Sequence, residues 1–488
     1  MSNYRYSDTL RSGANQELPL RAVAGSRLTY SDPIATSDLG LYLHRMRFVR
    51  DPIKYLMGLY RKFGLTVMIN KGKDKPVLIY NFAPELNELL FGNPDLFHWS
   101  IPRPIHAPEP IRVLGSSFIT MDGEEYRQRL QLTRNSLHSR FIESWRAKMV
   151  RHTQKMLDGW KADEQRDMHH EMHWLAHTID VDALFSVEDP GTVAMLHDLS
   201  GTLRRTGTRR PLLPFRLKRS GGPYAGMLDS ADKLVTFLRK IIAQKRAGQP
   251  QELDMLDMLM SSTAENGAKL NDDDIIAEAY TFMNPETTAS ALTWTLFLLV
   301  QHPDVLGDVL DELDSVLHGE APALEQFGRL KLLENVIKES LRLFPPFSFR
   351  RRRSAQACQF GPFEIPERVE IVSSQYVTHR LPEIYRDPQR FVPSRWETLK
   401  PTQFEYFPFG SITHHCLGKH YVNLELTIVL SMLLQRYRLS MVPGARVDRR
   451  VSIGLEPANG VPMTIVRQDR RFTRQAVKGN VNEMVEFA

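Results

Sequence analysis

The spacing of apolar and polar residues divides the chain into three stretches. Before about residue 120, short apolar runs alternate with loops, and residues 65–69 and 76–80 predict two strands joined as a hairpin. Four prolines within residues 99–112 predict a loop. Helical spacing then dominates to about residue 345. After that point short strands and irregular loops return, before one more apolar helix at 418–436.

The longest helical pattern begins at Asn271, a good N-cap followed by three aspartates that the helix dipole favours. It runs to Pro303 over about 30 residues, long enough to cross a large domain. Pro285 lies inside this pattern and removes a backbone hydrogen bond. We therefore predict a kink near Met283 and Asn284.

Polar side chains follow that proline directly. Glu286, Thr287 and Thr288 lie where the helix is expected to be buried, and an unused buried carboxylate or hydroxyl is costly. In one interpretation a threonine caps the broken turn. In the other, Glu286 and Thr287 form a proton relay into a pocket. The residues themselves leave both interpretations open.

Two further segments carry charge. In a helix predicted at 329–343, Glu339 and Arg342 are three residues apart and share one face. On spacing alone they are an ordinary surface ion pair, worth about 0.3 kcal/mol.

Residues 199–228 carry seven arginines and lysines and no acidic residue. This segment is either a solvated loop between helices or a mobile lid that attracts an anionic ligand or a membrane surface.

Composition excludes several classes of protein. The 488 residues are 42% hydrophobic and 25% charged, as in a globular protein of roughly one to three domains, and a formal charge of +6 is too dilute for a nucleic-acid binder. Two cysteines, Cys358 and Cys416, exclude a disulfide scaffold and fit a reducing, cytoplasmic compartment. The first 35 residues are polar, and no apolar run approaches the ~20 residues that span a bilayer, so we expect a soluble protein.

Cys416 has the most informative surroundings. It follows a glycine-containing loop and precedes the apolar helix at 418–436, so a thiolate there would gain from the helix N-terminus and from backbone N–H groups. A metal held by one thiolate needs its other ligands from elsewhere, as a haem iron does. On spacing alone, a reactive nucleophile or an inert buried cysteine fits equally well.

The residues around Cys416 resemble the cysteine signature of the cytochrome P450 family, the haem-thiolate monooxygenases. The resemblance spans about residues 40 to 468, and further family motifs follow in order. The signature positions are Phe409, Gly410, His414, Cys416 and Gly418; the other motifs are Glu-x-x-Arg at 339–342, a segment at 391–396 that contains Arg395, the acid-alcohol pair Glu286 and Thr287, and weaker echoes at 122–123, 379–382 and 457–463.

The resemblance implies a fold and domain limits. We expect a mainly α protein with a small β region (α+β), in which a haem lies between the long central helix and the cysteine-bearing loop. Residues 1–35 are expected to form a polar N-terminal extension, 36–470 a single catalytic domain, and 471–488 a C-terminal tail.

The resemblance also implies roles for individual residues. Cys416 would be the proximal ligand of the haem iron. Thr287 and Glu286 would deliver protons for oxygen activation. Arg352 would pair with a haem propionate, and otherwise belongs to the solvated run 350–353. The further expected haem contacts are His414, as a second propionate partner, with Tyr126, Phe409, Gly410 and Gly418; the expected structural network is Glu339, Arg342 and Arg395.

The substrate pocket implied by the family is mostly apolar and aromatic. Arg350 is the exception, and it either points to solvent or holds a substrate carboxylate. The expected lining residues are Trp99, Ile105, Phe118, Phe282, Met283, Phe347, Phe349, Arg350 and Leu455.

The chain departs from the family pattern at three places. Ile412 stands where the family usually has a glycine, and Met283-Asn284-Pro285 replaces small residues before the acid-alcohol pair. In the helix after Gly123 the family often has an arginine at the position of Leu130; Arg127 or Arg129 is a candidate substitute.

The function implied by the resemblance is insertion of one oxygen atom of O2 into an apolar small molecule by hydroxylation or epoxidation. The expected cofactor is haem b, and electrons come from NAD(P)H through a separate ferredoxin or flavodoxin-type protein, for which Lys419 and Arg134 are candidate docking residues or simply solvated. We expect the protein to be a monomer and to act in secondary metabolism. The alternatives are peroxide-dependent oxidation or isomerisation at haem, and a non-enzymatic haem-binding protein.

Overall fold

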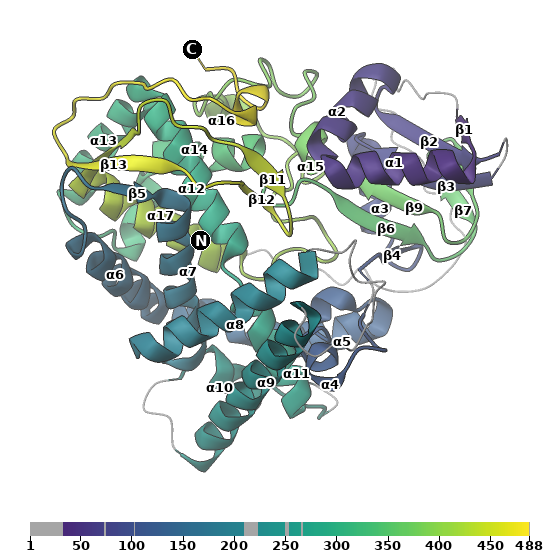
Figure 1. The fold of residues 1–488 in the computed structure, drawn as a ribbon, viewed down its shortest axis with the longest axis horizontal. Coiled ribbons are helices and arrows are strands. Elements are labelled where there is room, and N and C mark those ends of the chain that lie inside the picture. The colour runs from purple at the N-terminus through teal and green to yellow at the C-terminus, as the bar shows by residue number, and fades with distance from the viewer. Residues whose placement is uncertain are drawn as a thin grey trace.

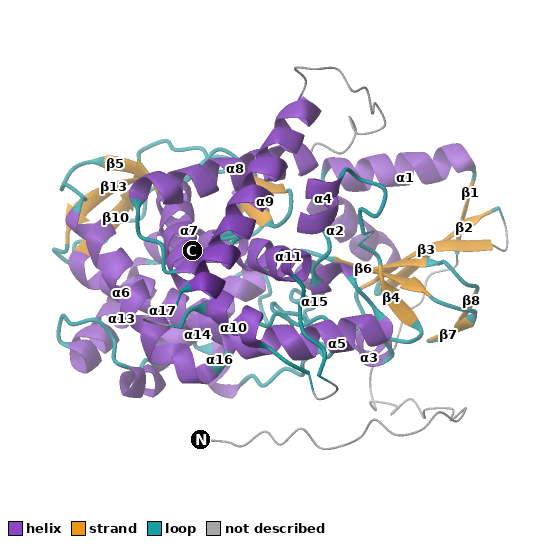
Figure 2. Cartoon of the chain, turned by 90° about the horizontal axis from the view of Figure 1, so that it is seen from below, coloured by secondary structure: helices purple, strands orange, loops and turns teal. Residues whose placement is uncertain are grey.

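The computed structural model describes residues 33–72, 75–101, 103–208, 223–248, 253–264 and 267–487. Helices fill most of the molecule, and a six-stranded sheet lies at one side (Figure 1). A second view places a three-stranded sheet at the opposite end, with the helices between the two sheets (Figure 2). The expectation of a mainly helical α+β fold is confirmed.

The described helices range from short turns to long rods. They are α1 (Asp38–Arg50), α2 (Pro52–Phe63), α3 (Pro84–Gly92), α4 (Glu109–Leu114), α5 (Gly123–Thr133), α6 (Ile142–Asp158), α7 (Met168–Phe185), α8 (Pro190–Thr208), α9 (Pro223–Ala247), α10 (Met255–Ser261), α11 (Asp272–Phe282), α12 (Glu286–Gln301), α13 (Pro303–Leu317), α14 (Lys331–Leu343), α15 (Gln375–Thr378), α16 (Arg395–Thr398) and α17 (Lys419–Arg436).

The six-stranded sheet has the order β1-β2-β3-β9-β6-β4 and is mixed, with parallel pairs at β1/β2 and β3/β9. The predicted hairpin is present as β2 and β3, with Ile69 opposite Leu78. The strands are β1 (Ile34–Thr36), β2 (Thr66–Lys71), β3 (Lys75–Asn81), β4 (Phe97–Trp99), β5 (Gln165–Asp167), β6 (Arg350–Ser354), β7 (Cys358–Phe360), β8 (Phe363–Ile365), β9 (Glu370–Ser373), β10 (Tyr437–Met441), β11 (Arg449–Val451), β12 (Leu455–Pro457) and β13 (Pro462–Arg467).

The long central pattern folds as two helices rather than one kinked helix. The predicted start is confirmed, because Asn271 and Asp274 cap α11 reciprocally. The helix then ends at Phe282, and α12 begins at Glu286, directly after Pro285. Proline has no N–H to continue the ladder, and its fixed φ suits the start of a helix, so it produces a break instead of a bend.

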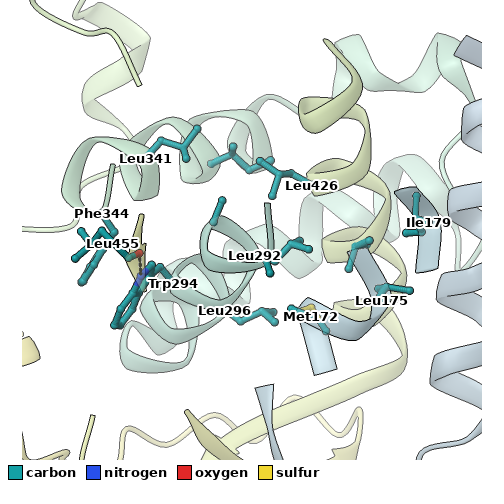
Figure 3. Close-up of a cluster of buried hydrophobic side chains, with 14 of the residues drawn as sticks. Met172, Leu175, Ile179, Leu292, Trp294, Leu296, Leu341, Phe344, Leu426 and Leu455 are labelled. Carbon is teal, nitrogen blue, oxygen red and sulfur yellow. Dashed lines mark hydrogen bonds between the residues drawn. The ribbon is translucent and has the colours of Figure 1, made fainter. Parts of the chain in front are cut away.

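Helix α12 runs through the core of the molecule. Apart from Thr287, every residue of it is buried. Trp294 stacks on Phe344 at 4.5 Å between ring centroids, and its Nε1 donates to the carbonyl of Leu455 at 3.0 Å (Figure 3). The same close-up shows side chains of α7 packing on the other side of α12. The middle of α12 is therefore packed from several directions.

The remaining predicted segments are recovered with shifted limits. The helix expected at 329–343 is α14, and that expected at 418–436 is α17. The basic segment 199–228 is helical to Thr208 and again from Pro223, while residues 209–222 lie outside the described residues. Residues 1–32 of the expected extension also lie outside them. In the expected tail, Val481 and Met484 are fully buried against the helices.

Candidate active site

Cys416 lies at the end of a loop that leads directly into α17. Its backbone N–H donates to the carbonyl of Phe409 at 2.7 Å, which closes the loop on itself. Burial raises the pKa of the Cys416 thiol, while the Gly418 N–H, Arg350 and Lys419 lower it. A backbone donor and positive charge therefore lie near the sulfur, an arrangement that favours a thiolate once a metal replaces the thiol proton.

Three residues of this loop have a left-handed backbone. The φ angles are +81° at Gly410, +44° at Ile412 and +54° at His414. A Cβ at Gly410 would lie 2.6 Å from the guanidinium nitrogens of Arg350, so the bare glycine lets that arginine pack against the loop. Ile412 keeps the conformation expected of the family's glycine, although a β-branched residue pays about 1–2 kcal/mol for it.

His414 is buried between two aromatic rings. Its ring stacks on those of Tyr126 and Trp99, at 3.9 and 5.1 Å between centroids. Nδ1 lies 3.2 Å from a nitrogen of Arg352, and Nε2 lies 2.8 Å from the carbonyl of Met121. Because arginine only donates, Nδ1 accepts and Nε2 carries the proton. Burial lowers the pKa of His414 to about 3, so this ring is neutral.

Strand β6 brings two buried guanidinium groups to the same loop. Arg350 Nη1 donates to the carbonyl of His414 at 2.9 Å, and Arg352 Nη2 lies 3.4 Å from the carbonyl of Thr413. Burial lowers their pKa values, to about 10 for Arg350 and about 9 for Arg352. Their side chains are 8% and 1% exposed, so the interpretation of either as a solvated surface arginine is wrong.

Two N–H donors beside these arginines have no acceptor among the described residues. They are Nε of Arg352 and Nε1 of Trp99, both buried. An unpaired buried donor costs about 1–3 kcal/mol, and a buried cation requires compensation by an anion. A carboxylate bound beside Arg352 could accept from its Nε and would add to the negative charge that Asp122 already supplies. The donor set therefore fits the propionate of the haem that the sequence implies.

Tyr126 supports the loop from α5. Its hydroxyl accepts a hydrogen bond from the backbone N–H of His414 at 2.9 Å. Neither arginine considered as a substitute on this helix faces the loop. Arg127 pairs with Glu124 at the surface, and Arg129 is directed toward α11.

Glu339 and Arg342 form a buried network rather than a surface pair. Both side chains are fully buried, and two nitrogens of Arg342 donate to the carboxylate at 2.8 and 2.9 Å. Arg395, the Trp396 indole and the Val392 N–H also donate to it, at 2.9, 3.0 and 3.0 Å. Arg342 further donates to three backbone carbonyls of residues 379–390. The network thus ties α14 to the irregular segment before the cysteine loop.

The capping interpretation of the polar residues after Pro285 does not describe the break between α11 and α12. Pro285 is the N-cap of α12, and no side chain caps that end. The amide of Asn284, rather than a threonine, reaches back to the Tyr280 carbonyl at 2.9 Å. Glu286 is 5% exposed and lies in the first turn of α12, where the helix dipole stabilises a carboxylate.

Sequence reasoning missed the partners of Glu286. Arg204 of α8 forms an ion pair with its carboxylate, and His173 Nε2 of α7 lies 3.6 Å from its Oε1. These residues are about 80 and 110 positions away in the chain, so only folding brings them together. The four-residue spacing of His169, His173 and His177 was the one available signal, since it places three imidazoles on one helix face.

A second buried carboxylate, Glu278 of α11, was also missed. It accepts hydrogen bonds from the Ser117 hydroxyl at 2.7 Å and the Phe118 N–H at 3.0 Å, and it pairs with Arg129. Burial raises the pKa of Glu278 to about 7. This carboxylate fastens the loop before α5 to α11.

The structure separates the expected pocket residues into groups. Phe118 and Phe282 lie near each other, 6.4 Å between ring centroids, and Met283 is fully buried beside the start of α12. Trp99 and Arg350 lie at the cysteine loop. Phe349 packs on Phe48 of α1, and the carbonyl of Leu455 accepts from Trp294. Ile105 and Phe347 are 58% and 39% exposed.

The cytochrome P450 family matches residues 39–458 of the chain. The putative cytochrome P450 139 of Mycobacterium tuberculosis is 28% identical, over 81% of this chain and 92% of its own length. Cyclooctatin synthase of Streptomyces melanosporofaciens is 28% identical, over 86% and 93%. Pentalenene oxygenase of Streptomyces avermitilis is 26% identical, over 69% and 76%.

The fold is similar to that of the retinoic acid bound cyanobacterial CYP120A1. The TM-score is 0.76 at 22% sequence identity, and the match covers 90% of this chain and all of the other. Within the described ranges, none of the helices is long and apolar enough to cross a membrane.

Proposed function

The chain belongs to the cytochrome P450 family, and from that premise we propose that it is a monooxygenase whose iron is bound by the thiolate of Cys416. Members of the family are oxidoreductases that use a haem iron and O2 on small molecules and receive electrons from a redox partner. The finer expectations are haem b and electrons from NAD(P)H through a ferredoxin or flavodoxin-type protein. When bound, the haem supplies the redox chemistry on O2, which no amino-acid side chain provides.

The observation that carries the proposal is the construction of the cysteine loop. The sulfur lies at the start of α17, the loop is closed by the Cys416-to-Phe409 hydrogen bond, and the loop backbone accepts from Arg350. Beside it, Arg352 and Trp99 offer unsatisfied donors for a carboxylate. A lone buried cysteine needs none of this surrounding positive charge.

We also propose that Glu286 and Thr287, which lie away from the cysteine loop at the start of α12, deliver protons. Glu286 is a buried carboxylate in the first turn of α12, and Thr287 is the next residue along the helix. A hydroxyl next to a carboxylate can pass a proton to oxygen at the site and recover one from the acid. Phe118, Phe282 and Met283 supply an apolar wall nearby and limit the access of water.

We propose a largely hydrocarbon substrate that contains rings. The apolar residues beside the start of α12 support this, and so do the names of two relatives, pentalenene oxygenase and cyclooctat-9-en-7-ol 5-monooxygenase, the second 26% identical. The guanidinium of Arg350 is engaged with the carbonyl of His414, so a substrate carboxylate has no evident partner there. A screen by shift of the haem Soret band, with neutral cyclic hydrocarbons against carboxylic acids of equal size, tests this preference.

Carbon monoxide binding tests the iron ligand. We expect the reduced, haem-containing protein to show the red-shifted band of a thiolate-ligated haem, and Cys416→Ser to lose it. Cys358→Ser is the matched control, because that cysteine lies in the separate two-stranded sheet formed by β7 and β8. Identical spectra for the wild type and Cys416→Ser would contradict the assignment.

A second candidate function, peroxide-dependent chemistry at haem, is favoured by one observation. Arg204 forms an ion pair with the carboxylate of Glu286, so a cation occupies this acid in the present arrangement. Thr287→Ala separates the two functions: an oxygenase relay loses turnover driven by O2 and reductase, by up to about a hundredfold, and keeps peroxide-driven turnover. Thr288→Ala is the control. Equal effects of both variants would favour the peroxide-dependent function.

A further inference from the structure

A row of imidazoles lies between α7 and α8, outside the residues that the sequence singled out. His169, His173 and His177 are spaced four residues apart on α7. The ring of His197, from α8, lies 5.1 Å from that of His173 and 5.2 Å from that of His177, both edge-to-face. Among the described residues, no group of histidine, cysteine and carboxylate side chains could hold a metal ion.

Two of these rings, those of His197 and His173, link the carboxylate of Asp198 at the surface to that of Glu286 through a continuous series of polar contacts. Asp198 is 87% exposed, and its Oδ1 lies 3.7 Å from His197 Nδ1. His197 Nε2 lies 3.1 Å from His173 Nδ1. His173 Nε2 lies 3.6 Å from Glu286 Oε1. Each ring therefore uses one nitrogen toward solvent and the other toward the carboxylate.

The last step of this series is occupied by Arg204. Its Nη1 lies 2.7 Å from His173 Nε2 and also pairs with the carboxylate of Glu286. Arginine can only donate, so His173 Nε2 accepts and its Nδ1 carries the proton. That proton points at His197 Nε2, which leaves the proton of His197 on Nδ1, facing Asp198. One contact thus sets the tautomers of both rings.

We propose that Asp198, His197 and His173 form a proton path from solvent to Glu286. In the structure Arg204 holds both rings in the tautomer that follows a transfer, with the proton on Nδ1. The proposal rests on the proposed oxygenase function, because it supplies the proton that Glu286 gives up there.

The steps balance with one proton transferred. In the state that is ready to transfer a proton, both rings are neutral and carry their proton on Nε2. His173 passes the Nε2 proton to Glu286 Oε1, His197 passes its Nε2 proton to His173 Nδ1, and water or Asp198 returns one to His197 Nδ1. Both rings then carry the proton on Nδ1, which is the arrangement that Arg204 imposes in the structure. The next transfer requires Arg204 to withdraw and the rings to return to the Nε2–H form.

The surroundings keep the two rings neutral, as such a path requires. Burial lowers the pKa of His173 to about 3 and also lowers that of His197. Other titratable groups near the two rings are His169, His170 and His177 on α7 and Glu456 on β12. Arg205, Tyr280 and Arg450 lie near Arg204. A neutral imidazole can release a proton from one nitrogen and take one up at the other. A protonated ring has no acceptor nitrogen, and a glutamine amide forms hydrogen bonds but does not transfer a proton.

Kinetics of the haem-containing protein with excess NADPH, ferredoxin and reductase test the path. Without added substrate, we expect O2 uptake to fall at least about tenfold in His173→Gln and in His197→Gln, with a larger D2O effect than in the wild type. Oxidation of the phenol guaiacol by hydrogen peroxide should stay within about twofold, because hydrogen peroxide brings its own protons. His170→Gln, on an exposed position of the same helix, is the control and should match the wild type.

A second measurement does not depend on turnover. Nitrogen-15 NMR of labelled histidine in the reduced, carbon monoxide-bound protein, assigned by loss of signals in His173→Gln and His197→Gln, should show both rings neutral with the proton on Nδ1. Protons on Nε2, or charged rings at neutral pH, would overturn the proposal.

The kinetic outcomes are also decisive. Wild-type O2 uptake and D2O effect in both glutamine variants would overturn the path, and so would parallel loss of the O2-driven and peroxide-driven rates, which indicates a structural role. Failure of the wild type itself to give the thiolate carbon monoxide band would instead contradict the proposed function, so the two failures are distinguishable.

Discussion

The cysteine loop and the α11–α12 junction are held by opposite kinds of interaction. At the loop, buried arginines bind backbone carbonyls: Arg342 donates to carbonyls of residues 379–390, and Arg350 to that of His414. At the junction, the acid is held by side chains: Glu286 contacts Arg204 and His173, while Asn284 donates to a backbone carbonyl and Glu278 accepts from the Phe118 N–H. Backbone partners cannot rotate away, whereas side chains exchange partners by changing rotamer.

This difference corresponds to what each region is proposed to do. An iron ligand has to stay in one place, so a loop fixed through its own backbone suits it. A proton donor has to change its protonation state and its partner in each cycle, so titratable side chains suit it. The comparison predicts that substitutions at the loop change stability, and that substitutions at the junction change the response to pH.

The largest effect is expected at the network behind the loop. Glu339→Gln leaves Arg342 and Arg395 buried without a counter-charge, and loss of one partner of a buried pair costs about 3–5 kcal/mol. We expect a matching fall in the free energy of urea unfolding at pH 7, together with loss of haem content. Glu334→Gln, on the solvent side of the same helix, should cost about 0.5 kcal/mol or less. A loss below about 1 kcal/mol at Glu339 would break the comparison.

The next effect tests the junction through pH. Burial raises the pKa of Glu278 to about 7 from 4.5, so the folded protein binds this proton more tightly than the unfolded chain. The stabilisation is complete below about pH 4.5 and is lost as pH rises through about 7, by up to about 3 kcal/mol. Glu278→Gln should therefore remove most of that slope in unfolding free energy between pH 5 and 8.

One control variant and one comparison sharpen the measurement of the pH slope. Glu325→Gln, an exposed carboxylate elsewhere, should leave the slope unchanged. Arg129 pairs with both Glu278 and Asp274, so the slope is compared between wild type and variant rather than taken alone. A slope in Glu278→Gln equal to that of the wild type would show that this carboxylate does not titrate in the range.

The smallest effect is expected at the loop backbone. Ile412→Gly relieves about 1–2 kcal/mol of left-handed strain and loses about 0.5–1 kcal/mol to the freedom of glycine in the unfolded chain, for a net gain of about 0.5–1 kcal/mol. Thermal unfolding of the haem-containing protein measures it. Ile453→Gly is a matched control, because Ile453 is 44% exposed, against 43% for Ile412, and its φ is not positive. This control variant should destabilise the protein. Destabilisation by Ile412→Gly would contradict the strain assignment.

Much of the fold could be predicted from local pattern. The hairpin β2–β3, the capped start of α11, and helices α14 and α17 follow from periodicity and end signals that lie within each segment. The continuous central helix was the error, because a proline inside a strong apolar pattern permits either a kink or a break. The packing of the neighbouring helices selects between them.

The sequence by itself determined the family and the pairing of Glu339 with Arg342, and it singled out Cys416 as the candidate iron ligand, because these depend on ordered motifs and short spacings. Only the tertiary structure decided that Arg350 serves the cysteine loop rather than solvent, and that Glu286 meets Arg204 and His173. Those contacts join residues from separate helices and strands. No local pattern encodes which of many similar charges will be buried together, since the desolvation that selects them exists only in the folded state.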